Sequence, residues 1–104
     1  MNDELQNDAD PDDPDRTELR VAGSTGPRDL AMSIASTLRT GKKVTLVALG
    51  ANAVSQAIKS VPIVNGFFAS KGFVFVVLPI LEDRMTDEGI KTVQLMKLVR
   101  HDIY

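Results

Sequence analysis

The chain has 104 residues, enough for one small domain, and it lacks cysteine, so disulfide bonds and thiolate metal sites are excluded. All 12 basic residues lie in residues 16–104, whereas half of the 14 acidic residues lie in residues 1–15, so the larger part carries a net charge of +5. A basic body of this kind permits a polyanionic partner. No apolar stretch reaches the roughly 18–20 residues of a membrane span, and the acidic N-terminus has no hydrophobic secretion signal. We therefore expect a cytoplasmic protein without a membrane partner.

Residues 1–15 form an acidic segment with very little apolar surface. Residues 7–15 contain two prolines, and Ala9 is their one other apolar residue. Such a composition cannot bury enough surface to offset the entropy of ordering the chain. We therefore expect residues 1–15 to be a disordered tail and residues 16–104 to form one domain. Two roles for the tail stay open: it aids solubility, or it regulates by competing with a polyanion for the basic body.

Regular patterns begin after this tail. Alternation of apolar and charged residues over 17–21 predicts a half-exposed strand. The segment AGSTGPRD (22–29) predicts a turn into a helix, because Pro27 suits the first helical position and Asp29 favours the helix dipole in the first turn. Apolar residues spaced i, i+4 and i+8 then predict an amphipathic helix that ends near Thr40–Gly41; they are Leu30, Ile34 and Leu38.

The middle of the chain predicts a second strand and a second helix. Residues 43–49 are apolar on both sides of the strand, which is typical of a central position. Pro62 is expected to bend the second helix or to end its regular part, and residues 65–72 are expected to form a loop. The residues expected to face inward from this helix are Val54, Ala57, Ile58 and Val61. The aromatic residues Phe67, Phe68 and Phe73 are candidates for a dimer contact, unless they close the core under the loop.

Two further strands are predicted to complete the domain. Pro79 cannot donate to a ladder, so strand 73–81 should lie at a sheet edge or carry a bulge. Residues 82–89 are expected to form a long hairpin tip, and residues 90–99 to return antiparallel. The end segment 101–104 has no predicted structure. The order β-α-β-α-β-β indicates a two-layer α/β (α+β) domain with a mixed sheet.

No set of residues suitable for catalysis can be assembled. The single histidine, His101, lies near the C-terminus, and there is no Ser/His/Asp or Cys/His combination. The glycines of residues 22–26 are not part of a GK[ST] or GxGxxG motif. The acids of the predicted hairpin tip do not have the spacing of a calcium loop and indicate a solvated surface; they are Glu82, Asp83, Asp87 and Glu88. We therefore expect no enzyme, no metal and no cofactor.

The two strand-to-helix junctions carry the features that suit a phosphate chain. Both junctions follow strands expected to run parallel, so both should lie at the same edge of the sheet. Backbone amides, amide side chains and cations would converge there on a polyanion. The residues predicted from this pattern to bind nucleic acid are Arg28, Lys42, Lys43, Asn52, Gln56 and Lys59.

A resemblance to the stage V sporulation protein S family, which has an Alba-like fold, is clearest in residues 47–80, VALGANAVSQAIKSVPIVNGFFASKGFVFVVLPI. It extends over about residues 17–100. The resemblance implies a four-stranded mixed sheet of order 1-2-4-3 with both helices on one face. It also implies a homodimer formed through the end that carries the second helix and the last strands. The residues expected at that dimer interface are Val61, Val64, Phe67 and Phe68.

The same resemblance implies binding of DNA or RNA in developmental gene control. It adds Ser24 and Thr25 to Arg28 as residues of a first loop that would approach a nucleic-acid backbone. Two departures weaken the charge of the site: Asn52 stands where Alba chromatin proteins have an arginine, and the hairpin EDRMTDEG is acidic where theirs is arginine-rich. Since like charges repel phosphate, weak or regulated binding is expected rather than coating of chromatin.

We therefore expect a dimeric nucleic-acid-binding regulator of bacterial development, cytoplasmic or associated with the nucleoid. A second hypothesis is a protein-interaction module that holds a developmental partner, favoured by Phe67, Phe68 and the acidic hairpin. A third hypothesis is that the protein binds a small anionic ligand, such as a nucleotide, at the turn formed by residues 23–28.

Overall fold

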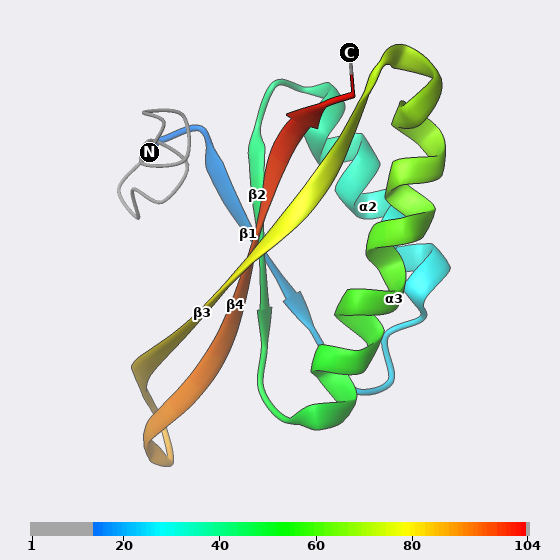
Figure 1. Cartoon of the computed structure of the whole chain (residues 1–104). Coiled ribbons are helices and arrows are strands. Elements are labelled where there is room, and N and C mark those ends of the chain that lie inside the picture. The colour runs from blue at the N-terminus through cyan, green and yellow to red at the C-terminus, as the bar shows by residue number, and fades with distance from the viewer. Residues whose placement is uncertain (1–13, 104) are drawn as a thin grey trace.

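The computed structural model describes residues 14–103, so most of the predicted tail, residues 1–13, lies outside the described residues. Two strand–helix units are followed by a long hairpin (Figure 1). The elements are β1 (Arg16–Val21), α2 (Pro27–Arg39), β2 (Lys43–Ala48), α3 (Ala51–Phe68), the 3-10 turn η1 (Ala69–Lys71), β3 (Phe73–Thr86) and β4 (Gly89–Asp102). The predicted order β-α-β-α-β-β is confirmed.

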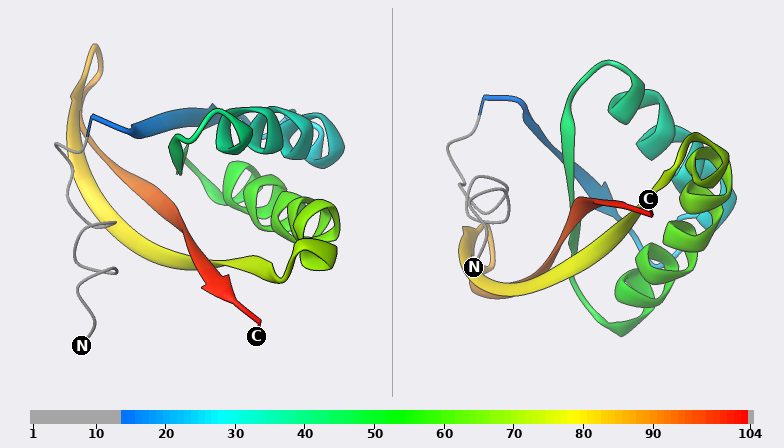
Figure 2. Two further views of the ribbon diagram at one scale, coloured as in Figure 1. Left: turned by 90° about the horizontal axis from the view of Figure 1, so that it is seen from above. Right: turned by 45° about the horizontal axis from the view of Figure 1, so that its top comes forward.

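The four strands form one mixed sheet of order β1-β2-β4-β3. β1 and β2 are parallel, and β4 is antiparallel to both of its neighbours. Both helices cover the same face of this sheet, and the opposite face, here called the open face, curves away from them (Figure 2). The two-layer fold and the strand order implied by the family resemblance are therefore confirmed.

The core lies between this sheet and the two helices. Ile34 of α2 and Leu46 of β2 have no exposed surface, and Met96 of β4 is almost as fully buried. β2 lies between β1 and β4. Its alternate residues are covered by the helices on one face of the sheet and by side chains of neighbouring strands on the open face. This central position explains why its sequence is apolar on both sides, as predicted.

Helix α3 is longer than the sequence predicts, because it continues through Pro62 to Phe68. Of the two effects expected of Pro62, an end to the regular helix is therefore wrong, and a bend stays a prediction. Pro62 is exposed, so the carbonyl group that loses its partner can be hydrated. Ile58 is also misassigned: it is 47% exposed, and the inward stripe is formed instead by Ala53, Ala57, Val61, Val64 and Phe68.

The segment predicted as a loop at residues 65–72 consists of the last turn of α3 and η1, followed by Gly72. Asn65 ties this end of α3 to the sheet: its Nδ2 donates to the Phe75 carbonyl oxygen at 3.1 Å, and the Phe75 N–H donates to its Oδ1 at 2.8 Å. Phe68 is only 4% exposed, and its ring centroid lies 5.3 Å from that of Phe73. These aromatic residues therefore close the core, which was the alternative to a dimer contact.

Pro79 lies on the edge strand β3, as predicted, and no bulge is needed to accommodate it. The pairing with β4 is unbroken from Phe73 to Thr86. Because the backbone of Phe75 faces outward to Asn65, Pro79, four residues later, also has its nitrogen on the outward side. The Asn65 amide and the proline therefore protect this edge from pairing with another strand.

The hairpin differs from the predicted long tip at residues 82–89. β3 continues to Thr86 and β4 begins at Gly89, so only Asp87 and Glu88 connect them. Gly89 has φ of 101°, a left-handed conformation that suits glycine. Charged residues on both faces of 82–84 hide the strand alternation in the sequence. His101 also belongs to β4.

Candidate functional site

The two strand-to-helix corners touch each other. A Cβ built on Gly23 would lie 3.0 Å from the Asn52 Cβ and 3.9 Å from the Ala53 backbone nitrogen. Gly23 belongs to the turn between β1 and α2, and Asn52 to the first turn of α3. Figure 1 shows both corners at the same end of the sheet, as expected for parallel strands. The predicted proximity of the corners is confirmed.

Each corner is shaped by its own short sequence. Thr25 closes the first turn, because its N–H donates to the Ala22 carbonyl at 3.0 Å and its Oγ1 accepts from the Ala22 N–H at 2.9 Å. At the second corner, Gly50 has φ of 93°, a left-handed conformation, and precedes α3 without a capping side chain. The first N–H groups of α3 are therefore available as donors at its positive end.

Six of the predicted nucleic-acid-binding residues lie on these corners or on the helices that begin there. Ser24, Thr25 and Arg28 belong to the first corner, and Asn52, Gln56 and Lys59 to the first three turns of α3. Arg28, Asn52 and Lys59 are exposed, whereas Gln56 is half-buried. Asp29 shares the first turn of α2 and reduces the positive potential there.

Lys42 and Lys43 lie elsewhere. Lys43 begins β2, and the second corner follows the opposite end of that strand, after Ala48. At about 3.3 Å per residue, Lys43 and Ala48 are about 16 Å apart. The structure therefore does not bring Lys42 and Lys43 to the corners, because the sequence places them before the strand and not after it.

The hairpin extends past the corners as an arm, residues 82–93. The last pair between β2 and β4 joins Ala48 to Gln94, so the arm has no β2 beside it. It curves over the open face, where Arg84 donates to both carboxylate oxygens of Glu18 at 2.9 and 2.5 Å and also pairs with Glu82. The bond from Arg84 lowers the pKa of Glu18, and the two carboxylates raise the pKa of Arg84.

This curvature encloses a hollow of about 230 Å³ on the open face. Lys97 lines it and is only 4% exposed. Arg16 also lines it, and its Nη1 donates to the Thr45 Oγ1 at 2.7 Å. Sequence reasoning missed both this hollow and the Glu18–Arg84 pair, because they depend on how the arm folds back across the sheet.

The predicted dimer residues are largely used within one chain. Val61, Val64 and Phe68 are buried in the core, and Phe67 is half-buried against it. Three of the four therefore offer almost no surface to a partner. Exposed apolar side chains lie instead beside them, on α3 and on β3.

Within residues 14–103, no three His, Cys, Asp or Glu side chains are grouped so that they could hold a metal ion. No helix in this range has the length and apolar character needed to cross a membrane.

The fold and the paired corners define a small two-layer α/β protein with donors gathered at one end of a mixed sheet. The family described as stage V sporulation protein S (SpoVS) matches residues 17–101. The chain belongs to this sporulation-related family, as the resemblance in residues 47–80 predicts.

Proposed function

We propose that this protein is a nucleic-acid-binding regulator of bacterial development that contacts a phosphate backbone with its two corners, and that it is not an enzyme. The observation that carries the proposal is the contact between Gly23 and Asn52, which brings the turn before α2 against the N-terminus of α3. Backbone N–H groups and amide side chains position a protein on a nucleic-acid backbone, and helix N-termini favour anions. The proposed place of action is the cytoplasm.

Arg28 and Lys59 are the exposed cations of the corners themselves, and Arg20 at the end of β1 is a further exposed cation beside the first corner. The log–log salt slope of binding is about −0.9 per phosphate contact on duplex DNA. The corners of one chain should therefore contribute a slope of about −2. This small charge, together with the acidic arm at the same end, favours weak or regulated binding.

Titration of labelled short DNA and RNA with the full chain, at several salt concentrations, tests the proposal. The double variant Arg28→Gln/Lys59→Gln should bind more weakly and lose about two units of slope per chain. Ser33→Ala, which changes an exposed neutral residue of α2, is the control. No binding by the full chain at low salt would refute the proposal.

We propose further that the protein is a homodimer, formed along the boundary between α3 and the edge strand β3. Asn65 contacts β3, and Ile58 lies two turns earlier on the same flank of α3. Leu81 shares the helix-side face of β3 with Phe75, beyond the part that α3 covers. The exposed apolar strip along this boundary consists of Ile58, Pro62, Pro79 and Leu81.

Sedimentation or light scattering of Ile58→Glu tests this dimer. The variant should be monomeric, since a buried unpaired carboxylate is costly. Met32→Glu is a matched control, because Met32 is also an exposed apolar residue on a helix. A wild-type chain that is monomeric at all concentrations would remove the dimer from the proposal.

A second candidate function is a protein-interaction module. It is favoured by the arm, where Met85 is 76% and Ile90 66% exposed and the two lie opposite each other in the strand register. Exposed apolar pairs of this kind are typical of interaction sites. A partner that resists nuclease and salt, and is lost in Met85→Ser/Ile90→Ser, would favour this function over nucleic-acid binding.

A further inference from the structure

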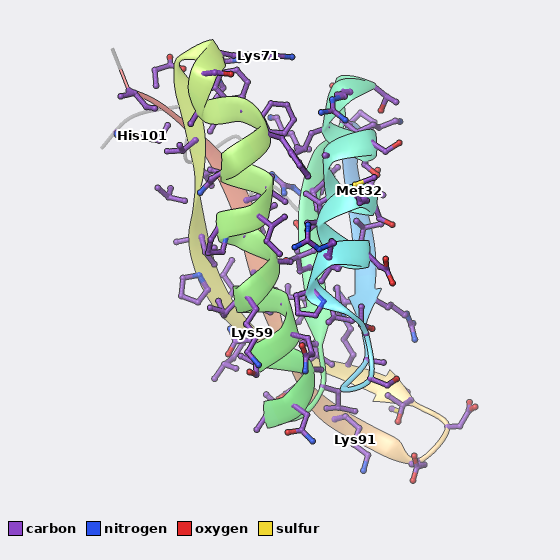
Figure 3. The ribbon with its side chains drawn as sticks, turned by 90° about the vertical axis from the view of Figure 1, so that its right-hand side faces the viewer. Met32, Lys59, Lys71, Lys91 and His101 are labelled. Carbon is purple, nitrogen blue, oxygen red and sulfur yellow. The ribbon has the colours of Figure 1, made fainter. Side chains whose placement is uncertain are left out.

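The exposed positive charge of the described residues is least offset by acids at the end opposite the corners, although Arg20, Arg28 and Lys59 are exposed at the corner end. Four exposed cations surround the place where α2 and α3 finish: Arg39, Lys42, Lys71 and Arg100. Figure 3 shows Lys71 and His101 at this end and Lys59 toward the other. Among the described residues, the acids at this end are Asp15 and Asp102, whereas the corner end carries Asp29 and the acids of the arm.

Three of these cations form cation–π contacts with one aromatic cluster. The Arg39 guanidinium lies 5.5 Å from the Phe68 ring centroid, and the Lys71 Nζ lies 5.8 Å from the same centroid. The Arg100 guanidinium lies 3.9 Å from the centroid of Phe73, which stacks on Phe68. We call these four cations and the rings of Phe67, Phe68 and Phe73 the cation–aromatic end.

In the part of the chain that the structure describes, this arrangement leaves three of the four cations without a neutralising carboxylate. Within residues 14–103, the side chains of Arg39, Lys42 and Lys71 form no ion pair, and Arg100 pairs with Asp102 at 2.9 Å. A guanidinium beside a ring retains its fork of N–H donors, and this fork geometry matches a phosphate. A half-buried ring such as Phe67 adds a surface on which a base can stack.

We propose that the cation–aromatic end is a second surface for a phosphate chain, with a larger electrostatic share of binding than the corners. The proposal rests on the proposed function for the class of partner, a nucleic acid, but not for its location. The 18 residues of α3 separate the two surfaces by about 27 Å. This distance exceeds the Debye length of about 8 Å at physiological salt, so the two surfaces contribute independently.

Two matched double variants separate the surfaces. Arg39→Gln/Lys71→Gln removes two cations from the cation–aromatic end, and Arg28→Gln/Lys59→Gln removes two from the corners. With labelled single-stranded DNA and RNA as probes, the first variant should lose about 1.4 units of salt slope and bind about ten- to a hundredfold more weakly near 0.1 M salt. The charge-conserving variant Arg39→Lys/Lys71→Arg should bind these probes with an affinity close to that of the wild type. Thermal melting checks that each variant is folded.

Lys42→Gln provides a further variant, because Lys42 contacts no ring and its loss should leave folding unchanged while removing about 0.7 unit of slope. Unchanged binding by both Arg39→Gln/Lys71→Gln and Lys42→Gln would overturn the inference and leave the corner proposal intact. If only the corner variant binds normally, the corner proposal fails and the inference stands. If the wild type binds neither probe, both fail.

A second copy of the chain is the competing partner for this end, since its acidic arm has the complementary charge. Sedimentation without nucleic acid distinguishes that case. A mass that falls in Arg39→Gln/Lys71→Gln while nucleic-acid affinity is unchanged would assign the end to self-association and overturn the inference.

Discussion

Arg84 of the hairpin arm donates to both carboxylate oxygens of Glu18, although the two residues are 66 positions apart in the chain. The pair joins the last hairpin to the first strand across the open face. It therefore holds the acidic arm against the sheet, at the end where the two corners lie (Figure 1).

The Glu18–Arg84 pair predicts a pH-dependent contribution to stability. The folded-state pKa of Glu18 is lowered by its hydrogen bonds from Arg84, so the contribution is full above the unfolded-state pKa. It is lost as the pH falls through the lower folded-state pKa. Glu18 has a side chain that is 46% exposed, and an exposed pair is worth about 0–1 kcal/mol. Urea unfolding should show Glu18→Gln less stable than wild type by that amount at neutral pH, with the difference vanishing in acid. A difference that persists at acid pH would contradict this account.

Asn65→Ala should destabilise the protein by about 1–3 kcal/mol, because the variant removes both partners of the Phe75 backbone groups. The edge of β3 should also become more open to pairing. Chemical denaturation measures the stability, and hydrogen exchange at the Phe75 amide reports the edge. Ser55→Ala, on the exposed side of the same helix, is the control and should change little. Unchanged exchange at Phe75 would be inconsistent with the Asn65 bond.

Gly23→Ala should force the two corners apart, because the added Cβ would lie 3.0 Å from the Cβ of Asn52. We expect a loss of about 1–3 kcal/mol of stability, as for other overpacked sites, and weaker nucleic-acid binding. Gly66→Ala is the control: no atom lies within 4 Å of its added Cβ, and alanine favours a helix. Equal stability and equal nucleic-acid affinity of Gly23→Ala and Gly66→Ala would show that the contact between the corners has no effect on either property.

Deletion of residues 1–13 tests the regulatory tail. If these residues compete with phosphate for the basic domain, the shortened chain should bind nucleic acid more tightly, with the largest gain at low salt. The comparison needs the full and shortened chains at two ionic strengths. Equal affinities of the two chains would show that the segment does not compete with phosphate, and would leave solubility as its role.

Residues with strong local patterns are the ones whose structure could be predicted. Pro27 and the spacing from Leu30 to Leu38 specify α2, and the doubly apolar β2 is central. The end of α3 differs from the prediction, and the segment beyond Pro62 is held against the sheet by Asn65, whose partner Phe75 lies ten residues away in the chain. In the hairpin, charged residues on both faces concealed the strand.

The candidate site shows the same division between local and distant information. The meeting of the corners follows from parallel strands and was predicted. The displacement of Lys42 and Lys43 to the other end follows from the direction of β2, which separates residues before a strand from those after it. The cation–π contact between Arg39 and Phe68 joins two helices, and no local pattern indicates it.

The central claim is that the paired corners bind a phosphate chain, and its most direct test is the salt dependence of nucleic-acid binding by the wild type and by Arg28→Gln/Lys59→Gln. The account predicts weaker binding by the variant and a slope reduced by about two units per chain. Identical affinities and slopes for the two folded proteins would contradict it.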